Sequence, residues 1–357
     1  MKSGKSLQEL AQQLDNIRKD SKDFIVPTVK MEMTSEGRIA FQGQTVKPTG
    51  WAHSQISTYA DVPKAYYDRI KDQNPGLLAQ NVNHGFAIQN TVARKDGKPE
   101  SRMLRTINGD LRAMLSSSFK RMDNYDLMNE TLPLMRDKGM YVDSCELTER
   151  RLYVKALTTQ MKADIKPGDT VQYGLVVSNS DVGSGSLRVE PLIFRLVCSN
   201  GLILPSAIKR YHVGKNQGSD DFYELLSDKT KELSEAAFWA QVRDVILASM
   251  QPAFFESQVN RLREAANAPI KNFDIPQVIE LSMKAVGLGN EKTSDDMVAY
   301  LANGADGAGL SKWGLMNAFT AAAQSDKVDY DESVELERAA SKILELTPNQ
   351  WRTISAA

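Results

Sequence analysis

The spacing of apolar residues separates the chain into a strand-rich part and a helical part. Short apolar runs of the length typical of strands recur up to residue 204, at 24–26, 39–41, 90–94, 101–107, 141–147, 152–157, 170–178, 185–189 and 194–204. From about residue 220 onward, apolar residues instead fall three or four positions apart, which is the period of a helical face. The pattern predicts an α+β fold, in which an antiparallel-sheet-rich central domain with flanking helices precedes an all-α C-terminal domain.

Helical segments are also expected before the sheet region. Four apolar residues between positions 7 and 17 lie on one face of a helix over residues 5–19, and residues 51–87 have the same texture. The polar, glycine-containing segment Gly214–Asp221 is typical of a domain boundary. The sequence therefore divides into an α+β core domain at 1–215 and an acidic α-helical domain at 216–357.

The composition is that of a globular protein without a membrane segment. Of the 357 residues, 41% are hydrophobic and 25% are charged. No apolar run approaches the roughly 20 residues that a membrane-spanning helix needs, and the first residues lack the apolar core of a signal peptide. We therefore expect a cytoplasmic protein that does not bind membranes.

Cysteine and histidine usage points away from metal chemistry. Cys145 and Cys198 form no CxxC pair and are expected to be buried thiols. His53, His84 and His212 are far apart, and no Cys/His cluster has the spacing of a zinc site. No metal and no cofactor is expected.

Charge is distributed unevenly along the chain, although the net charge is only −1. Residues 86–215 contain 20 Lys/Arg against 14 Asp/Glu, whereas residues 216–357 contain 13 against 22. The basic centre permits a polyanionic partner. The acidic helices either form a solvated surface or dock a protein partner.

Motifs for catalysis are weak. The glycines at 183 and 185 are not followed by the GK[ST] of a phosphate loop, and those at 304, 307 and 309 have the wrong order for a dinucleotide fingerprint. No GxSxG occurs, although a triad assembled in space remains open. The sequence thus favours a protein without catalytic residues. The alternative is a metal-dependent enzyme whose pocket is lined by the turns Ser178–Asp181 and Ser199–Gly201.

Basic residues interleaved with apolar and aromatic ones give the clearest candidate site. One group lies within residues 101–122 and a second within 188–215, which also contains Arg188, His212 and Lys215. Arginine and lysine can follow a phosphate backbone while aromatic rings stack on bases. The other interpretation is a charged sheet surface with intramolecular ion pairs. The candidate nucleic-acid-binding residues are Arg102, Arg105, Arg112, Phe119, Lys120, Arg121, Arg195, Lys209, Arg210 and Tyr211.

Several motifs in order resemble a known family. Residues 105–116 and 121–124, then 174–183, then 195–202 with Tyr211-His212, are similar to successive motifs of a phage/plasmid-like protein family of unknown function. The resemblance covers about residues 50–215 and implies no catalytic residues. It implies a setting in phages or plasmids, elements that often encode their own recombination and replication factors.

The outline of a basic sheet with a helical extension is also similar, at the level of fold, to phage single-strand annealing proteins related to the eukaryotic recombination mediator. The resulting expectation is a homo-oligomer that binds single-stranded DNA, and anneals complementary strands, in phage or plasmid recombination or replication. A phage enzyme of DNA metabolism and a structural or host-interaction protein are the alternatives.

Overall fold

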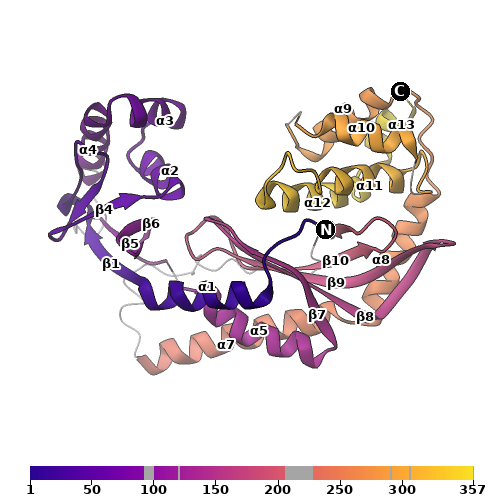
Figure 1. The fold of residues 1–357 in the computed structure, drawn as a ribbon, viewed down its shortest axis with the longest axis horizontal. Coiled ribbons are helices and arrows are strands. Elements are labelled where there is room, and N and C mark those ends of the chain that lie inside the picture. Colours follow the sequence, from indigo (N-terminus) through magenta and orange to yellow (C-terminus); the bar gives the residue numbers. More distant parts are fainter. Residues whose placement is uncertain (92–99, 120, 206–227, 290–291, 305–306, 357) are drawn as a thin grey trace.

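The fold contains two sheets, each with its own set of helices (Figure 1). The computed structural model describes residues 1–91, 100–119, 121–205, 228–289, 292–304 and 307–356. The strands of both sheets precede residue 204, and only helices follow residue 228 in the described ranges. The predicted α+β class, with antiparallel strands in the centre and helices at the C-terminus, is confirmed.

The first sheet has six strands in the order β1-β5-β6-β4-β3-β2. Its strands are β1 (Ser21–Pro27), β2 (Met31–Met33), β3 (Ile39–Phe41), β4 (Gln44–Pro48), β5 (Ser101–Ile107) and β6 (Asp110–Ser116), with the short helix η1 (Thr28–Lys30) after β1. Asn108 and Gly109 both have positive φ, as a tight hairpin between β5 and β6 requires. The helices α2 (Gly50–Tyr59), α3 (Lys64–Gln73) and α4 (Pro75–Thr91) complete this unit, and Ile56, Leu78 and Leu104 are fully buried in its core.

The second sheet has five antiparallel strands in the order β11-β10-β9-β8-β7. Its strands are β7 (Met140–Leu147), β8 (Leu152–Lys166), β9 (Asp169–Asn179), β10 (Arg188–Arg195) and β11 (Asn200–Ile203). Residues of β9 are buried on both faces because helices cover both sides of the sheet. One face packs on α1 (Leu7–Asp20), α5 (Asn124–Asp137), α7 (Asp228–Ser249) and α8 (Pro252–Ala266).

The opposite face of the second sheet lies under the C-terminal helices. These are α9 (Ile275–Val286), α10 (Ser294–Asn303), α11 (Lys312–Ala322), α12 (Tyr330–Leu344) and α13 (Pro348–Ala356). Tyr330 and Val334 of α12 pack directly on Tyr153 and Val176 of the sheet. Figure 1 shows these helices above the second sheet, with α1, α5 and α7 below it and the first sheet unit at the left.

The expected strand at 90–94 is wrong for residues 90 and 91, which end α4, where the Thr28 hydroxyl donates a hydrogen bond to the Asn90 side chain. Residues 92–94 and the expected domain boundary at 215/216 lie outside the described residues. Of the helices that the structure describes, none is long and apolar enough to cross a membrane.

Burial of His53 in the first sheet unit is expected to make the free energy of unfolding depend on pH. Its Nδ1 lies 2.7 Å from the Tyr67 hydroxyl, and burial, followed by the charges of Lys71 and Lys64, lowers the pKa of His53 from 6.5 to about 4. Between these two values the unfolded chain binds a proton that the folded chain does not, so the free energy of unfolding should fall as the pH drops through this window. Urea denaturation at several pH values should show a weaker dependence for His53→Gln.

The exposed His84 provides the matched control for this experiment, because His84→Gln should leave the dependence unchanged. An unaltered pH dependence in His53→Gln would assign the effect to other groups.

Candidate polyanion site

Two of the expected phosphate-binding arginines are buried in ion pairs. Arg105 is 3% exposed, and its guanidinium contacts both oxygens of Asp23 at 2.9 Å, Asp123 at 2.8 Å and the Asp181 carbonyl at 2.9 Å. Burial opposes its charge, but Asp23 and Asp123 outweigh that effect and raise the pKa of Arg105 above its usual range. We therefore remove Arg105 from the candidate phosphate contacts.

Arg195, the last residue of β10 in the second sheet, is also buried in an ion pair. It is 1% exposed, and its guanidinium makes two contacts with Asp169, at 2.5 and 2.9 Å. The Trp313 indole N–H also donates to Asp169, at 2.9 Å, and the Tyr300 hydroxyl lies 3.2 Å from Arg195. These contacts attach the sheet to α10 and α11, so Arg195 is also removed from the candidate phosphate contacts.

The other expected arginines that the structure describes also lie beside carboxylates. Arg112 lies 3.4 Å from Asp181, Arg102 pairs with Glu100 at 2.7 Å, and the more exposed Arg121 lies 3.1 Å from Asp23. Phe119 is half-buried against a small apolar cluster. Arg105, Arg112 and Arg121 are thus brought together by shared aspartates, as the ion-pair interpretation of the sequence expects. Lys120, Lys209, Arg210 and Tyr211 lie outside the described residues.

The turn between β7 and β8, residues 148–151, connects three parts of the molecule. The Glu149 carboxylate accepts a hydrogen bond of 2.7 Å from the backbone N–H of Trp51 at the start of α2. Arg150 pairs with Asp331 at the start of α12, at 2.8 Å. Arg151 donates to the Ser184 carbonyl, at 2.7 Å, in the connection between β9 and β10.

Arg150 and Arg151 belong to a group of four arginines, called here the arginine cluster. The other two are Arg188, the first residue of β10, and Arg338 of α12, and the charges of Arg151 and Arg338 both act on Arg188. Arg338 is well paired, since it contacts Glu190 at 2.5 Å and Glu335 at 2.8 Å. The charge of Arg338 is therefore neutralised by these two carboxylates.

Arg151 and Arg188 are less well compensated. Arg188 lies 3.9 Å from Glu190, and Arg151 has no carboxylate within ion-pair distance in the described part of the chain. The Nη1 atom of Arg151 and the Nε atom of Arg188 are buried, and neither has a hydrogen-bond acceptor among the described residues. Buried donors of this kind are uncommon, because leaving one unpaired costs about 1–3 kcal/mol.

The electrostatics of the cluster agree with this imbalance. Burial lowers the pKa of Arg188, and the neighbouring charges of Arg338 and Arg151 lower it further, against the opposing effect of Glu190. The guanidinium of Arg151 also lies against the backbone at Gly185, where a Cβ atom would come within 1.9 Å of its Nη2. An anion bound at the cluster would offset the repulsion between these guanidiniums, because it would add the negative charge that Arg151 and Arg188 lack.

Sequence reasoning did not select this site. Arg188 was in the second basic group, but Arg151 stood in a turn without any motif around it. Their proximity depends on the pairing of β8, β9 and β10, which brings residues 151 and 188 to one end of the sheet. In the described ranges, no three His, Cys, Asp or Glu side chains are arranged to hold a metal ion.

Comparison with known proteins gives a family without a known activity. No curated protein and no solved structure matches the chain. Among protein-family models, one described as "Domain of unknown function (DUF932)" matches residues 114–327, a range that contains the second sheet, most of the C-terminal helices and both under-compensated arginines. Because this match covers more than half of the sequence, the chain belongs to the DUF932 family.

Proposed function

We propose that this protein binds single-stranded DNA, and that the arginine cluster contacts its phosphates. The observation that carries the proposal is the pair of buried guanidinium nitrogens, Nη1 of Arg151 and Nε of Arg188, that have no acceptor among the described residues. A phosphate supplies several strong acceptor oxygens and a negative charge, and arginine binds it through its planar fork of donors.

Two further features favour a nucleic acid over a small isolated anion. The region between residues 86 and 215 has an excess of basic residues, which adds a long-range attraction for a polyanion. In addition, several motifs resemble a phage/plasmid-like family of unknown function, and phages and plasmids often encode their own recombination and replication factors. Annealing of complementary strands would follow if bound DNA keeps its bases exposed.

Fluorescence anisotropy of a labelled single-stranded oligonucleotide tests the proposal directly. We expect binding that weakens steeply as salt increases, because each neutralised phosphate releases a counterion. The double variant Arg151→Gln with Arg188→Gln should bind at least about tenfold more weakly and reduce the salt slope by about 1.4, since each lost contact to a single strand accounts for about 0.7.

Arg136→Gln is the matched control, because Arg136 on α5 has a side chain that is 80% exposed and its nearest carboxylate, Asp137, lies 3.9 Å away. This variant removes one arginine charge away from the cluster and should change the affinity little. Binding that does not depend on salt, or a correctly folded double variant that binds like the wild-type protein, would contradict the proposed function.

A further inference from the structure

Half of strand β8 has a free edge. The pairing of β7 with β8 ends at Met140 and Thr158, whereas β8 continues to Lys166 and pairs there only with β9. Thr159, Gln160, Lys162 and Asp164 are exposed along this segment. Among the described residues no strand occupies this edge, and such an edge is a template for pairing with another strand.

The direction of the backbone groups follows from two contacts. The Asp164 carbonyl accepts hydrogen bonds from the Arg263 guanidinium of α8, at 2.8 and 3.0 Å, so it points away from β9. On β9, the Thr170 carbonyl opposite Asp164 is bonded to Leu196 on the far side. Because residues two positions apart point the same way, the N–H and C=O of Lys162 also point to the free edge.

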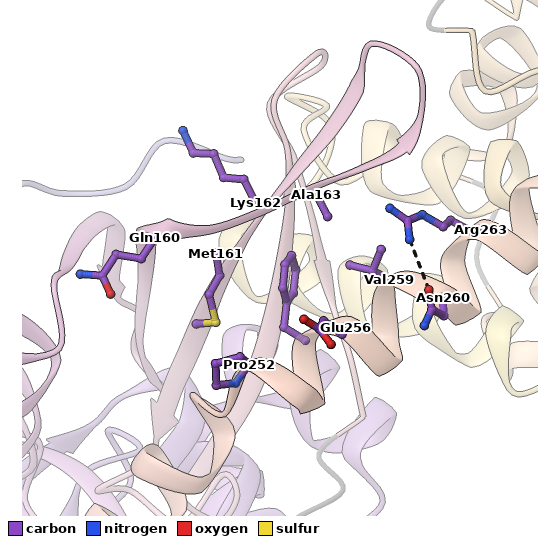
Figure 2. Close-up of a pocket in the computed structure, with 10 residues that line it drawn as sticks. Gln160, Met161, Lys162, Ala163, Pro252, Glu256, Val259, Asn260 and Arg263 are labelled. Carbon is purple, nitrogen blue, oxygen red and sulfur yellow. Dashed lines mark hydrogen bonds between the residues drawn. The ribbon is translucent and has the colours of Figure 1, made fainter.

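A cavity lies beside this segment, between β8 and α8. Its volume is about 520 Å³, and Figure 2 shows Met161 extending toward α8, where Val259 and Glu256 also line the space. The same view shows Lys162 extending to the opposite side of β8. The strand therefore has an apolar face toward α8 and a charged face away from it.

The sequence of the segment is complementary to itself when reversed. If two copies pair antiparallel with Ala163 opposite Ala163, then Lys162 of each copy lies opposite Asp164 of the other. In the same register Met161 lies opposite Ile165, on the face that carries the cavity. Opposite charges and apolar side chains in directly facing positions stabilise a strand pair, and a small residue at the symmetry axis permits close approach.

We propose that the protein forms a two-fold symmetric dimer in which the β8 edges of two copies pair about Ala163 and join their five-stranded sheets. A second copy is the occupant that satisfies both charged positions and the apolar face with one register. Arg263 opposes this dimer, because it holds the Asp164 carbonyl that the second copy would use. By occupying this carbonyl, Arg263 limits how strongly the edge can pair with a second strand.

Sedimentation velocity of the full-length chain over a range of concentrations tests the dimer. The wild-type protein should dimerise reversibly, and Arg263→Ala should dimerise more tightly because the carbonyl is freed. Lys162→Pro removes the outward N–H and should weaken the dimer at least about tenfold, whereas Lys162→Ala removes the charge but keeps the N–H and should weaken it less.

Charge reversal provides a test that does not depend on proline. Lys162→Asp places like charges opposite each other and should weaken the dimer, and adding Asp164→Lys should restore it, because the pair is then opposite in sign again. The proposal is overturned if wild type and Arg263→Ala both remain monomeric at every concentration. It is equally overturned if a dimer forms that neither Lys162→Pro nor Lys162→Asp weakens.

Discussion

Replacement of Lys155 by methionine is expected to lower the free energy of unfolding by about 3–5 kcal/mol. The Lys155 ammonium on β8 lies 2.5 Å from the Glu337 carboxylate on α12, and both side chains are 0% exposed. Methionine has a similar length, but it leaves the carboxylate buried without its partner. One oxygen of Glu337, Oε1, already has no hydrogen-bond partner among the described residues, so the loss of Lys155 removes the hydrogen bond of the other oxygen and leaves the Met1 ammonium as a nearby positive charge.

Urea denaturation of three variants checks this expectation. Lys155→Met together with Glu337→Gln should recover much of the loss, because the buried charge is then removed from both sides of the pair. Lys64→Met is the surface control: Lys64 and Asp68 form an exposed pair one helical turn apart, and its loss should cost less than about 1 kcal/mol. Equal losses in Lys155→Met and Lys64→Met would show that the buried pair contributes nothing special.

Arg105→Met is expected to cost a similar amount, about 3–5 kcal/mol. Arg105 connects β1, the start of α5 and the connection after β9 through Asp23, Asp123 and the Asp181 carbonyl. Its removal leaves Asp23 in a largely buried position with only the outer contact from Arg121. Denaturation should therefore report a large loss of stability.

Arg121→Met separates the two arginines that share Asp23. The Arg121 side chain is 55% exposed, so this variant should cost less than about 1 kcal/mol. If Arg105→Met were as stable as Arg121→Met, the contacts of Arg105 with Asp123 and the Asp181 carbonyl would not hold the first sheet unit to the rest of the chain.

The sequence predicted the elements better than their assembly. The helix predicted over residues 5–19 corresponds to α1, and the hairpin of β7 and β8 is also present, because the periodicity of both is local. By contrast, the antiparallel pairing of β1 with β5 joins residues about 80 positions apart, and no local pattern specifies it. Pairing of this kind depends on which faces must be buried together.

The candidate site illustrates the same limit for chemistry. An arginine in an apolar run looks the same in sequence whether it faces water or a buried carboxylate. Arg105 has its partner Asp23 82 residues away, so its burial was not visible from spacing. Arg151 lies in a turn that carries no motif. Its role becomes visible only in the folded chain, where the strands bring Arg188 and Ser184 next to it.

The number of residues in the turn at 148–151 determines whether three contacts can form together. Three successive side chains there reach α2, α12 and the connection after β9, each in a different direction. Inserting one residue would rotate all three attachments out of place at once, whereas a substitution removes only one. Related chains should therefore keep the number of residues in this turn.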